Sequence, residues 1–178
     1  MDNQDPGAAP SARLIAFSGL PGVGKSRIAR ELARVVDAVY LRIDSIEQSL
    51  RDAGSLVAPM NEAGYRVGYV VAEDNLKLGR SVVADCVNPI ATTRDAWRDV
   101  AERAGARLLE IEVRCSDAAE HRRRVESRTI DIPGLVPPTW DEVLSREYHA
   151  WDRAHVEVDS ATETPEQILR RIRELLKV

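Results

Sequence analysis

The sequence predicts an α/β fold with a five-stranded parallel sheet and helices on both of its faces. Short apolar runs alternate with segments of helical periodicity, a pattern typical of strands joined by crossover helices. The chain has 178 residues, with no internal repeat and no long linker, and about 100–200 residues are usual for one domain. We therefore expect a flexible, polar tail over residues 1–11 and a single domain over residues 12–178.

Apolar residues define the first elements. Residues 14–17 form an apolar run that predicts a strand. Residues 26–36 predict a helix, because apolar side chains recur there at helical spacing. Residues 38–43 predict the second strand, and about 45–51 predict a short helix before a break that contains glycine and proline.

The same alternation continues through the middle of the chain. A longer helix is expected over about residues 61–78, and the third strand over residues 81–86. Thr92 or Thr93 is expected to cap the next helix, which Gly105 ends. Residues 107–113 then predict the fourth strand.

The last third of the chain is marked by helix caps and prolines. Ser116 is expected to cap a helix that runs to about residue 128, and the three prolines of residues 130–138 require a loop. Capping boxes at Thr139 and Thr164 predict a helix to about residue 151 and a final helix. Between them, residues 155–158 predict the fifth strand. The final helix is expected to bury its apolar residues, Ile168, Leu169, Ile172, Leu175 and Leu176.

The segment after the first strand is a phosphate-binding loop, Gly19-Leu20-Pro21-Gly22-Val23-Gly24-Lys25-Ser26. Backbone N–H groups of such a loop and the positive end of the following helix bind phosphates. Lys25 would add a charge at the transferring phosphoryl group, the Ser26 hydroxyl would bind Mg²⁺, and Arg27 would extend the nucleotide site. The alternative is a glycine-rich turn that only resembles the pattern. The order of strand, loop and helix favours nucleoside triphosphate binding.

Two aspartates follow neighbouring strands, at the edge where parallel sheets bind ligands. Asp44 is a candidate for the carboxylate that orients an acceptor hydroxyl and accepts its proton. The alternative is that Asp44 caps the next helix, a role that Ser45 could equally take. Asp85 either holds Mg²⁺ through water or forms a hydrogen bond in a substrate loop. Arg94 is a candidate for binding phosphate or an acidic neighbour.

Arginines precede the proline-rich loop. Arg124 and Arg128 are four residues apart, which places them on one face of a helix, with His121 on the same side. Such a face suits a lid that closes over the triphosphate and stabilises charge on the transferring phosphoryl group. The alternative is a solvated helix whose arginines pair with Glu120 and Glu126.

Composition excludes several classes of protein. The net charge of −4 offers no broad basic surface, so nucleic acid is not an expected partner, although a local basic groove remains open. No apolar run approaches the roughly 20 residues of a membrane span, and the first residues lack the pattern of a signal peptide. Cys86 and Cys115 are expected to be buried, reduced thiols, which favours a cytoplasmic location.

The combined pattern resembles the small P-loop kinases of the nucleoside-monophosphate-kinase-like group. Its zeta-toxin-like, gluconate-kinase-like, chloramphenicol-phosphotransferase-like and polynucleotide-kinase-like members are often described as AAA-type ATP-binding proteins. The resemblance rests on residues 19–26, Arg42-Ile43-Asp44, Asp85, Arg124 and Arg128, and it covers nearly the whole chain from Leu14. It implies a three-layer P-loop NTPase fold with an arginine-bearing lid over about residues 117–138. It also implies that Asp44 engages the acceptor, that Arg124 and Arg128 bracket ATP, and that residues 159–165 hold adenine.

The expected activity is transfer of the γ-phosphate of ATP, with Mg²⁺, to a hydroxyl of a small-molecule acceptor. One alternative is a polynucleotide 5′-hydroxyl kinase, which needs a basic groove leading to Asp44. Another is a regulatory or toxin-type module that binds ATP without acting as a kinase. The sequence leaves open the acceptor, adenine against guanine preference, and whether the protein is a monomer or a homodimer.

Overall fold

The computed structural model describes residues 12–54 and 62–177. The predicted tail over residues 1–11 and the predicted helix start at residue 61 lie outside these residues. The described residues form a sheet of five parallel strands in the order β2-β3-β1-β4-β5. The strands are β1 (Arg13–Ser18), β2 (Val39–Arg42), β3 (Val82–Asp85), β4 (Arg107–Arg114) and β5 (Val156–Asp159). The predicted α/β fold is confirmed.

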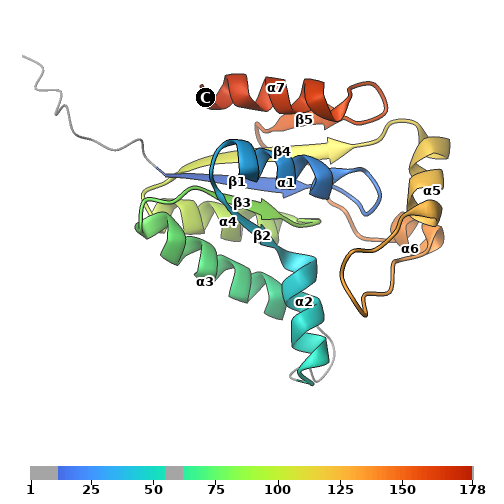
Figure 1. Ribbon diagram of the computed structural model, residues 1–178, viewed down its shortest axis with the longest axis horizontal. Helices are drawn as coiled ribbons and strands as arrows, with labels where there is room; N and C mark the ends of the chain where they lie inside the picture. The colour runs from blue at the N-terminus through green and yellow to red at the C-terminus, as the bar shows by residue number, and fades with distance from the viewer. Residues whose placement is uncertain (1–11, 55–61, 178) are drawn as a thin grey trace, which may run out of the picture.

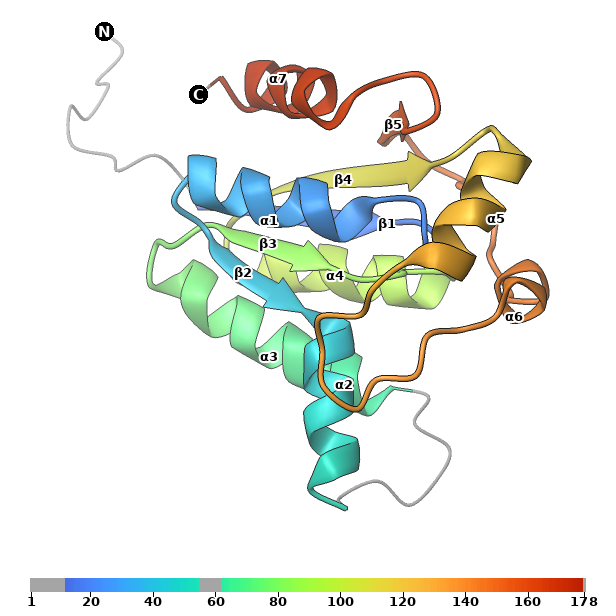
Figure 2. The ribbon, with the colours of Figure 1, turned by 45° about the vertical axis from the view of Figure 1, so that its right-hand side comes forward.

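Helices cover both faces of the sheet (Figures 1 and 2). One face carries α1 (Lys25–Val35) and α7 (Pro165–Leu176), and the other carries α3 (Ala63–Lys77) and α4 (Ala91–Arg103). The alternation of β1 explains this arrangement, because successive side chains of a strand point to opposite faces. Ile15 and Phe17 pack in the core with α1 and α7, whereas Leu14 and Ala16 pack in the core with α3 and α4.

The remaining helices lie at the carboxyl edge of the sheet. Figures 1 and 2 show α2 (Ile43–Asp52), α5 (Ala118–Ser127) and α6 (Trp140–Leu144) beyond the ends of the strands. In the register of the sheet, Phe17 and Arg42 both lie opposite Asp85. The phosphate-binding loop, the start of α2 and the end of β3 therefore meet at one edge.

Two predicted helix starts were wrong. Helix α4 begins at Ala91, and its N-cap Ile90 has no side-chain cap, so neither Thr92 nor Thr93 caps it. The N-cap of α5 is Asp117, whose carboxylate accepts hydrogen bonds from the backbone N–H groups of Ala119 and Glu120. Its predicted cap, Ser116, instead donates its backbone N–H to Asp159. The observed N-cap of α4 lies two or three residues before the expected threonines, and that of α5 lies one residue after Ser116.

The predicted helix over residues 139–151 was too long. The capping box at Thr139 is present, but α6 ends at Leu144. Beyond it, the backbone N–H of His149 donates to Pro89, and the carbonyls of His149 and Ala150 accept from Arg94. Tertiary hydrogen bonds replace the helical ones here. Leu175 was also misplaced, because it is 53% exposed.

Among the described residues, none of the helices has the length and apolar character needed to span a membrane. Cys86 is buried and Cys115 is half-buried, and both are free thiols.

Candidate active site

Three glycines give the phosphate-binding loop its conformation. Gly19, Gly22 and Gly24 all have positive φ, at +135°, +88° and +96°. A Cβ at Gly19 would lie 2.1 Å from the carbonyl oxygen of Val113, and one at Gly22 would lie 2.5 Å from the side chain of Val125. Only glycine avoids these contacts. Nothing lies within 4 Å of a Cβ built at Gly24, so this part of the loop is open to an approaching phosphate.

The loop is held from behind by α5. His121 Nε2 lies 2.8 Å from the carbonyl oxygen of Pro21, and both His121 and Val125 are buried. The backbone N–H of Gly19 donates to Val87 at 3.0 Å, which ties the loop to the segment after β3. Sequence analysis did not identify this role for His121, because its partner lies 100 residues away.

Lys25 is the first residue of α1 and is only 7% exposed. Its Nζ donates to the carbonyl oxygen of Leu20 at 3.1 Å. Burial lowers the pKa of Lys25, and the carboxylates of Asp85 and Asp44 oppose this effect. A buried ammonium group beside an open glycine loop is suited to bind a phosphate. The phosphate would give Lys25 a charged partner in addition to the neutral carbonyl of Leu20.

Asp85 is 3% exposed at the end of β3. Its Oδ2 accepts a hydrogen bond from the hydroxyl of Tyr40 at 2.7 Å, and Arg42 Nε lies 3.8 Å from the same oxygen. The hydroxyl of Ser26 lines the neighbouring cavity. A hydroxyl, a buried carboxylate and phosphate oxygens are the hard oxygen donors that Mg²⁺ prefers, so the residues present fit the ion.

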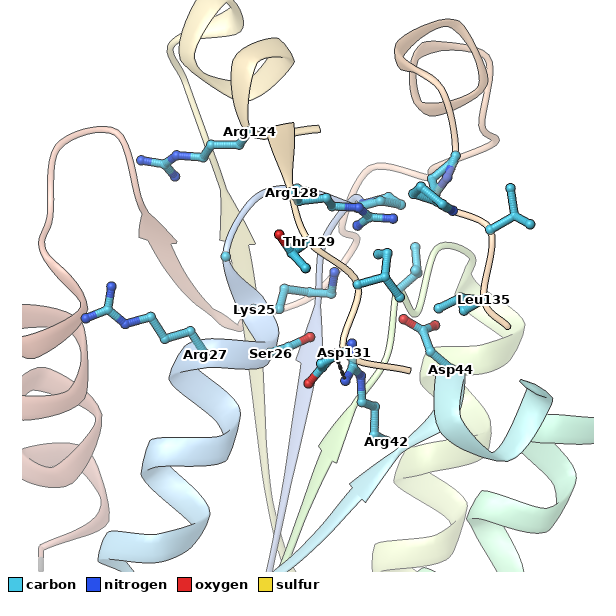
Figure 3. Close-up of a pocket in the computed structure, with 18 of the residues that line it drawn as sticks. Lys25, Ser26, Arg27, Arg42, Asp44, Arg124, Arg128, Thr129, Asp131 and Leu135 are labelled. Atoms are coloured by element: carbon cyan, nitrogen blue, oxygen red, sulfur yellow. Dashed lines mark hydrogen bonds and ion pairs between the residues drawn. The ribbon is translucent and has the colours of Figure 1, made fainter. Parts of the chain in front are cut away.

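Asp44 lies in the first turn of α2 rather than at the end of a strand. Helix α2 begins at Ile43 and has no side-chain cap, so Asp44 is not its N-cap. A carboxylate in the first turn still interacts favourably with the helix dipole. Figure 3 shows Asp44 across the cavity from Lys25 and Ser26.

One cavity of about 1070 Å³ joins the phosphate-binding loop to Asp44, whereas Asp85 is not among the residues that line it. It is lined by the phosphate-binding loop, by α2 and by the chain between α5 and α6 (Figure 3). The predicted site residues that line it are Pro21, Gly22, Gly24, Lys25, Ser26, Arg27, Asp44, Arg124 and Arg128. Leu20 and Val23 belong to the loop but do not line the cavity. Val23 is buried in the core, and Leu20 packs against this core.

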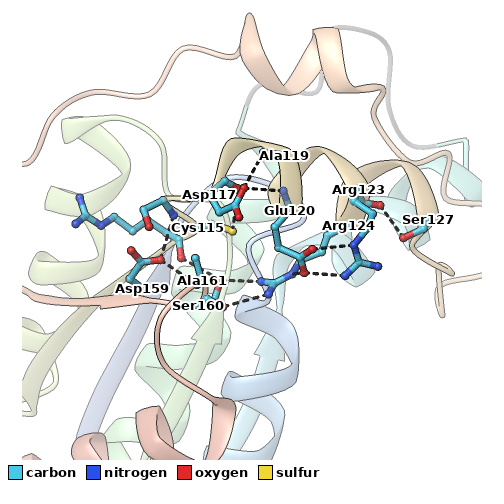
Figure 4. Close-up of polar contacts among 12 residues, drawn as sticks. Cys115, Asp117, Ala119, Glu120, Arg123, Arg124, Ser127, Asp159, Ser160 and Ala161 are labelled. Carbon is cyan, nitrogen blue, oxygen red and sulfur yellow. Dashed lines mark hydrogen bonds and ion pairs between the residues drawn. The ribbon is translucent and has the colours of Figure 1, made fainter.

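The two predicted lid arginines have different surroundings. Arg124 donates to Glu120 at 2.7 Å and to the side chain and carbonyl of Ser160 at 2.9 and 3.1 Å (Figure 4). Ser160 belongs to the loop that is the predicted adenine site. Arg128 lies one residue beyond the end of α5, with extended backbone, so the two arginines do not share a face of this helix.

Arg128 extends away from Arg124, toward the side of the cavity where Asp44 and Leu135 lie (Figure 3). Burial lowers the pKa of Arg128, and the Asp44 carboxylate opposes this effect. Its Nε is buried without a hydrogen-bond partner among the described residues. Such an atom favours a ligand that accepts a hydrogen bond.

Asp131 was missed by the sequence analysis. Its carboxylate accepts from Arg30 of α1 at 2.6 Å and from Arg42 of β2 at 2.7 Å. The hydrogen bond from Arg42 is the largest of the effects that lower the pKa of Asp131 to about 2. These two ion pairs hold the proline-rich loop at the carboxyl edge of the sheet.

Arg94 does not serve as a phosphate ligand or as the partner of an acid. It is 1% exposed and donates to the carbonyls of Asn88, Pro89, His149 and Ala150 at 2.8–3.2 Å. Its guanidinium also lies 4.1 Å from the ring of Trp151. The backbone carbonyls and the aromatic ring satisfy this buried charge.

The chain is similar in sequence to a known family and to two mycobacterial proteins. Residues 14–132, more than half of the chain, match the sequence model of the family AAA_33, described as an AAA domain. Uncharacterized proteins of Mycobacterium tuberculosis strain H37Rv and of Mycobacterium bovis are 30% identical over an alignment of 118 residues. The alignment covers 60% of this chain and 23% of each relative. The chain thus spans about a quarter of the length of these relatives.

Solved structures share the fold. The APS kinase CysC of Mycobacterium tuberculosis, in complex with AMPPNP and APS, superimposes with a TM-score of 0.70 at 20% identity, covering 96% of this chain and 100% of that one. A gluconokinase from Sinorhizobium meliloti gives 0.62 at 19% identity, covering 95% and 98%. A putative kinase from Chloroflexus aurantiacus gives 0.69 at 20% identity, covering 94% and 97%. The chain belongs to the AAA domain family AAA_33 and has the three-layer fold of the small P-loop kinases.

Proposed function

We propose that the protein is an ATP- and Mg²⁺-dependent phosphotransferase that moves the γ-phosphate to a hydroxyl group of a small-molecule acceptor, with residues 12–178 acting as one kinase domain. The observation that carries this proposal is the shared cavity, which has Lys25 and Ser26 on one side and the Asp44 carboxylate on the other. A triphosphate and an acceptor would meet there. Fold similarity to an APS kinase and a gluconokinase supports it.

Positioning and charge stabilisation would supply most of the rate. The loop amides and the ammonium of Lys25 bind the β- and γ-phosphates. Ser26 and Asp85 would hold Mg²⁺, which when bound neutralises charge on the phosphate oxygens. Arg124 links α5 to the loop proposed to hold adenine, and Arg128 supplies a cation beside the transferring group.

Asp44 acts as the general base. As the acceptor oxygen bonds to the γ-phosphorus, its proton passes to the Asp44 carboxylate. The bond between the γ-phosphorus and the bridging oxygen breaks, and its electron pair leaves with ADP.

The test is transfer of labelled γ-phosphate from ATP to a panel of sugars, nucleosides, antibiotics and 5′-hydroxyl oligonucleotides. Asp44→Asn is expected to lower the transfer rate by about 10²-fold or more, while ADP affinity stays within about threefold. Asp52→Asn, at the far end of the same helix and outside the cavity, is the matched control. Equal loss of transfer and ADP binding in Asp44→Asn would make Asp44 a structural residue.

Two other outcomes would replace this proposal. Preferential labelling of 5′-hydroxyl oligonucleotides would identify a polynucleotide kinase, for which the arginines near Asp44 would form the groove. Slow release of phosphate without any labelled acceptor, together with nucleotide-dependent binding of a protein partner, would identify a regulatory module.

A further inference from the structure

More cationic than acidic side chains line the cavity. Eight cationic and five acidic side chains line it, although the whole chain carries a net charge of −4. A triphosphate with its magnesium ion carries a charge of about −2. Glu120 and Glu166, which lie outside the lining, pair with Arg124 and Arg27. The cations open to a second anion are therefore those on the acceptor side of the cavity.

The arginines with the weakest pairing to carboxylates lie on the acceptor side. Asp131 pairs with Arg30 and Arg42, and Glu120 pairs with Arg124. Arg128 and Arg146 form no ion pair within residues 12–54 and 62–177, and Arg51 reaches Glu47 only at 3.7 Å. Arg128 is assigned to the transferring group under the proposed function. Arg51 and Arg146 come from two separate segments and line the same cavity; we call them the acceptor arginines.

Three carboxylates face the acceptor arginines. Under the proposed function, Asp44 accepts the proton of the acceptor hydroxyl. Burial, followed by the neighbouring Asp44 carboxylate, raises the pKa of Glu47. Glu142 uses one carboxylate oxygen, Oε2, for both the backbone N–H and the hydroxyl of Thr139. None of the three forms an ion pair shorter than 3.7 Å with an acceptor arginine within the described part of the chain.

An apolar wall closes the same half of the cavity. Leu135, Val136, Pro137 and Pro138 all line it, and Val136 is 82% exposed. Gly134 allows this segment to lie close to α2, because a Cβ at this position would lie only 3.0 Å from the amide nitrogen of Gln48. An exposed apolar side chain that faces a cavity gains by covering the carbon skeleton of a ligand.

From this arrangement we infer that the acceptor carries a permanent anionic group, a carboxylate, phosphate or sulfate, which the acceptor arginines bind while Asp44 engages its hydroxyl. The inference rests on the proposed function and specifies its substrate class. Asp44 and Arg51 lie seven residues apart on α2, roughly 10 Å along the helix axis. The hydroxyl and the anion therefore sit at opposite ends of the acceptor, with its apolar part against residues 135–138.

The test uses pairs of related probes, of which one member carries an anionic group and the other lacks it. They are adenosine 5′-monophosphate and adenosine, gluconate and glucose, and 4-hydroxyphenylacetate and its amide. Binding is measured by calorimetry on the protein saturated with Mg²⁺ and a β,γ-imido analogue of ATP, so that no anion can occupy the phosphate-binding loop. The analogue also prevents turnover, which separates binding from activity.

In at least one pair, the anionic member is expected to bind about tenfold or more tightly than its neutral partner. The double variant Arg51→Gln/Arg146→Gln is expected to remove this preference. The control Arg170→Gln, which removes an exposed arginine from α7, is expected to keep it. Equal affinity within every pair, including no binding by either member, would overturn the inference. So would a preference that survives in the double variant.

Labelled transfer with the same probes distinguishes the two proposals. Transfer confined to neutral acceptors, or preferential labelling of a 5′-hydroxyl oligonucleotide, would overturn the small anionic acceptor and leave a kinase. A charge preference in binding without transfer to any probe would support the anion site and count against the kinase.

Discussion

The imidazole Nε2 of His121 lies 2.8 Å from the carbonyl oxygen of Pro21, so the helix α5 is bonded directly to the phosphate-binding loop. A carbonyl oxygen only accepts hydrogen bonds, and Nε2 therefore carries the proton that is donated. The rings of His121 and Trp140 pack in a T-shaped arrangement, with their centroids 5.1 Å apart. The loop conformation thus depends on a side chain from the region predicted to be a lid.

His121→Ala is expected to lower the free energy of unfolding by about 2–3 kcal/mol, through a lost buried hydrogen bond and a cavity. ADP affinity is expected to fall about tenfold, because the loop loses its support. His121→Gln retains a donor and should recover part of both losses. Denaturant unfolding and calorimetry measure the two effects. His149→Ala, at an exposed histidine, is the control, and a loss as large as that of His121→Ala would contradict this account.

A substitution at Gly22 tests the packing of the phosphate-binding loop against α5. Gly22→Ala places a Cβ 2.5 Å from Val125 and forces alanine to φ +88°. Gly105→Ala is a matched control, because Gly105 has φ +63° and no atom within 4 Å of its Cβ position. The control should cost about 1–2 kcal/mol of stability from the backbone alone. Gly22→Ala should cost more and also abolish nucleotide binding.

A second substitution separates overlap from backbone strain. Val125→Ala in the Gly22→Ala background removes the overlapping methyl groups and should restore part of the nucleotide affinity. If the double variant binds no better than Gly22→Ala, the overlap with α5 is not the cause of the loss.

The features that sequence analysis predicted depend on local patterns. The phosphate-binding loop is contiguous, and the apolar run of residues 14–17 predicts the strand β1. The features it missed depend on distant partners. Asp131 bonds to arginines 101 and 89 residues away, and a proline-rich loop gives no pattern from which such contacts follow. The early end of α6 has the same origin, since the residues after it are held by Arg94.

Arg94 is expected to stabilise the fold rather than to act in catalysis. Arg94→Met removes a hydrogen-bond donor from four carbonyl groups and should lower the free energy of unfolding by about 3 kcal/mol or more. Arg98→Met, on the same helix but 43% exposed, should change it by less than about 1 kcal/mol. Thermal and denaturant unfolding give both values. Loss of phosphate transfer in Arg94→Met at unchanged stability would instead assign Arg94 to the active site.

Asp131 is expected to hold the proline-rich loop across the cavity at all physiological pH values. Its pKa is lowered to about 2 in the folded protein, most by Arg42, so the stabilising charge is fully present above the ordinary pKa near 4. It is lost only as the pH falls through about 2. Asp131→Asn should therefore raise the rate of amide hydrogen exchange in residues 129–138.

The ratio of exchange rates between Asp131→Asn and wild type should stay constant from about pH 5 to pH 9, after correction for intrinsic exchange. Glu126→Gln, which removes an exposed carboxylate paired with Arg122 on α5, is the control and should leave the loop unchanged. Because the loop also carries the apolar wall, Asp131→Asn should weaken acceptor binding more than ADP binding. A ratio that changes within this pH range would show that another titrating group, and not Asp131, holds the loop.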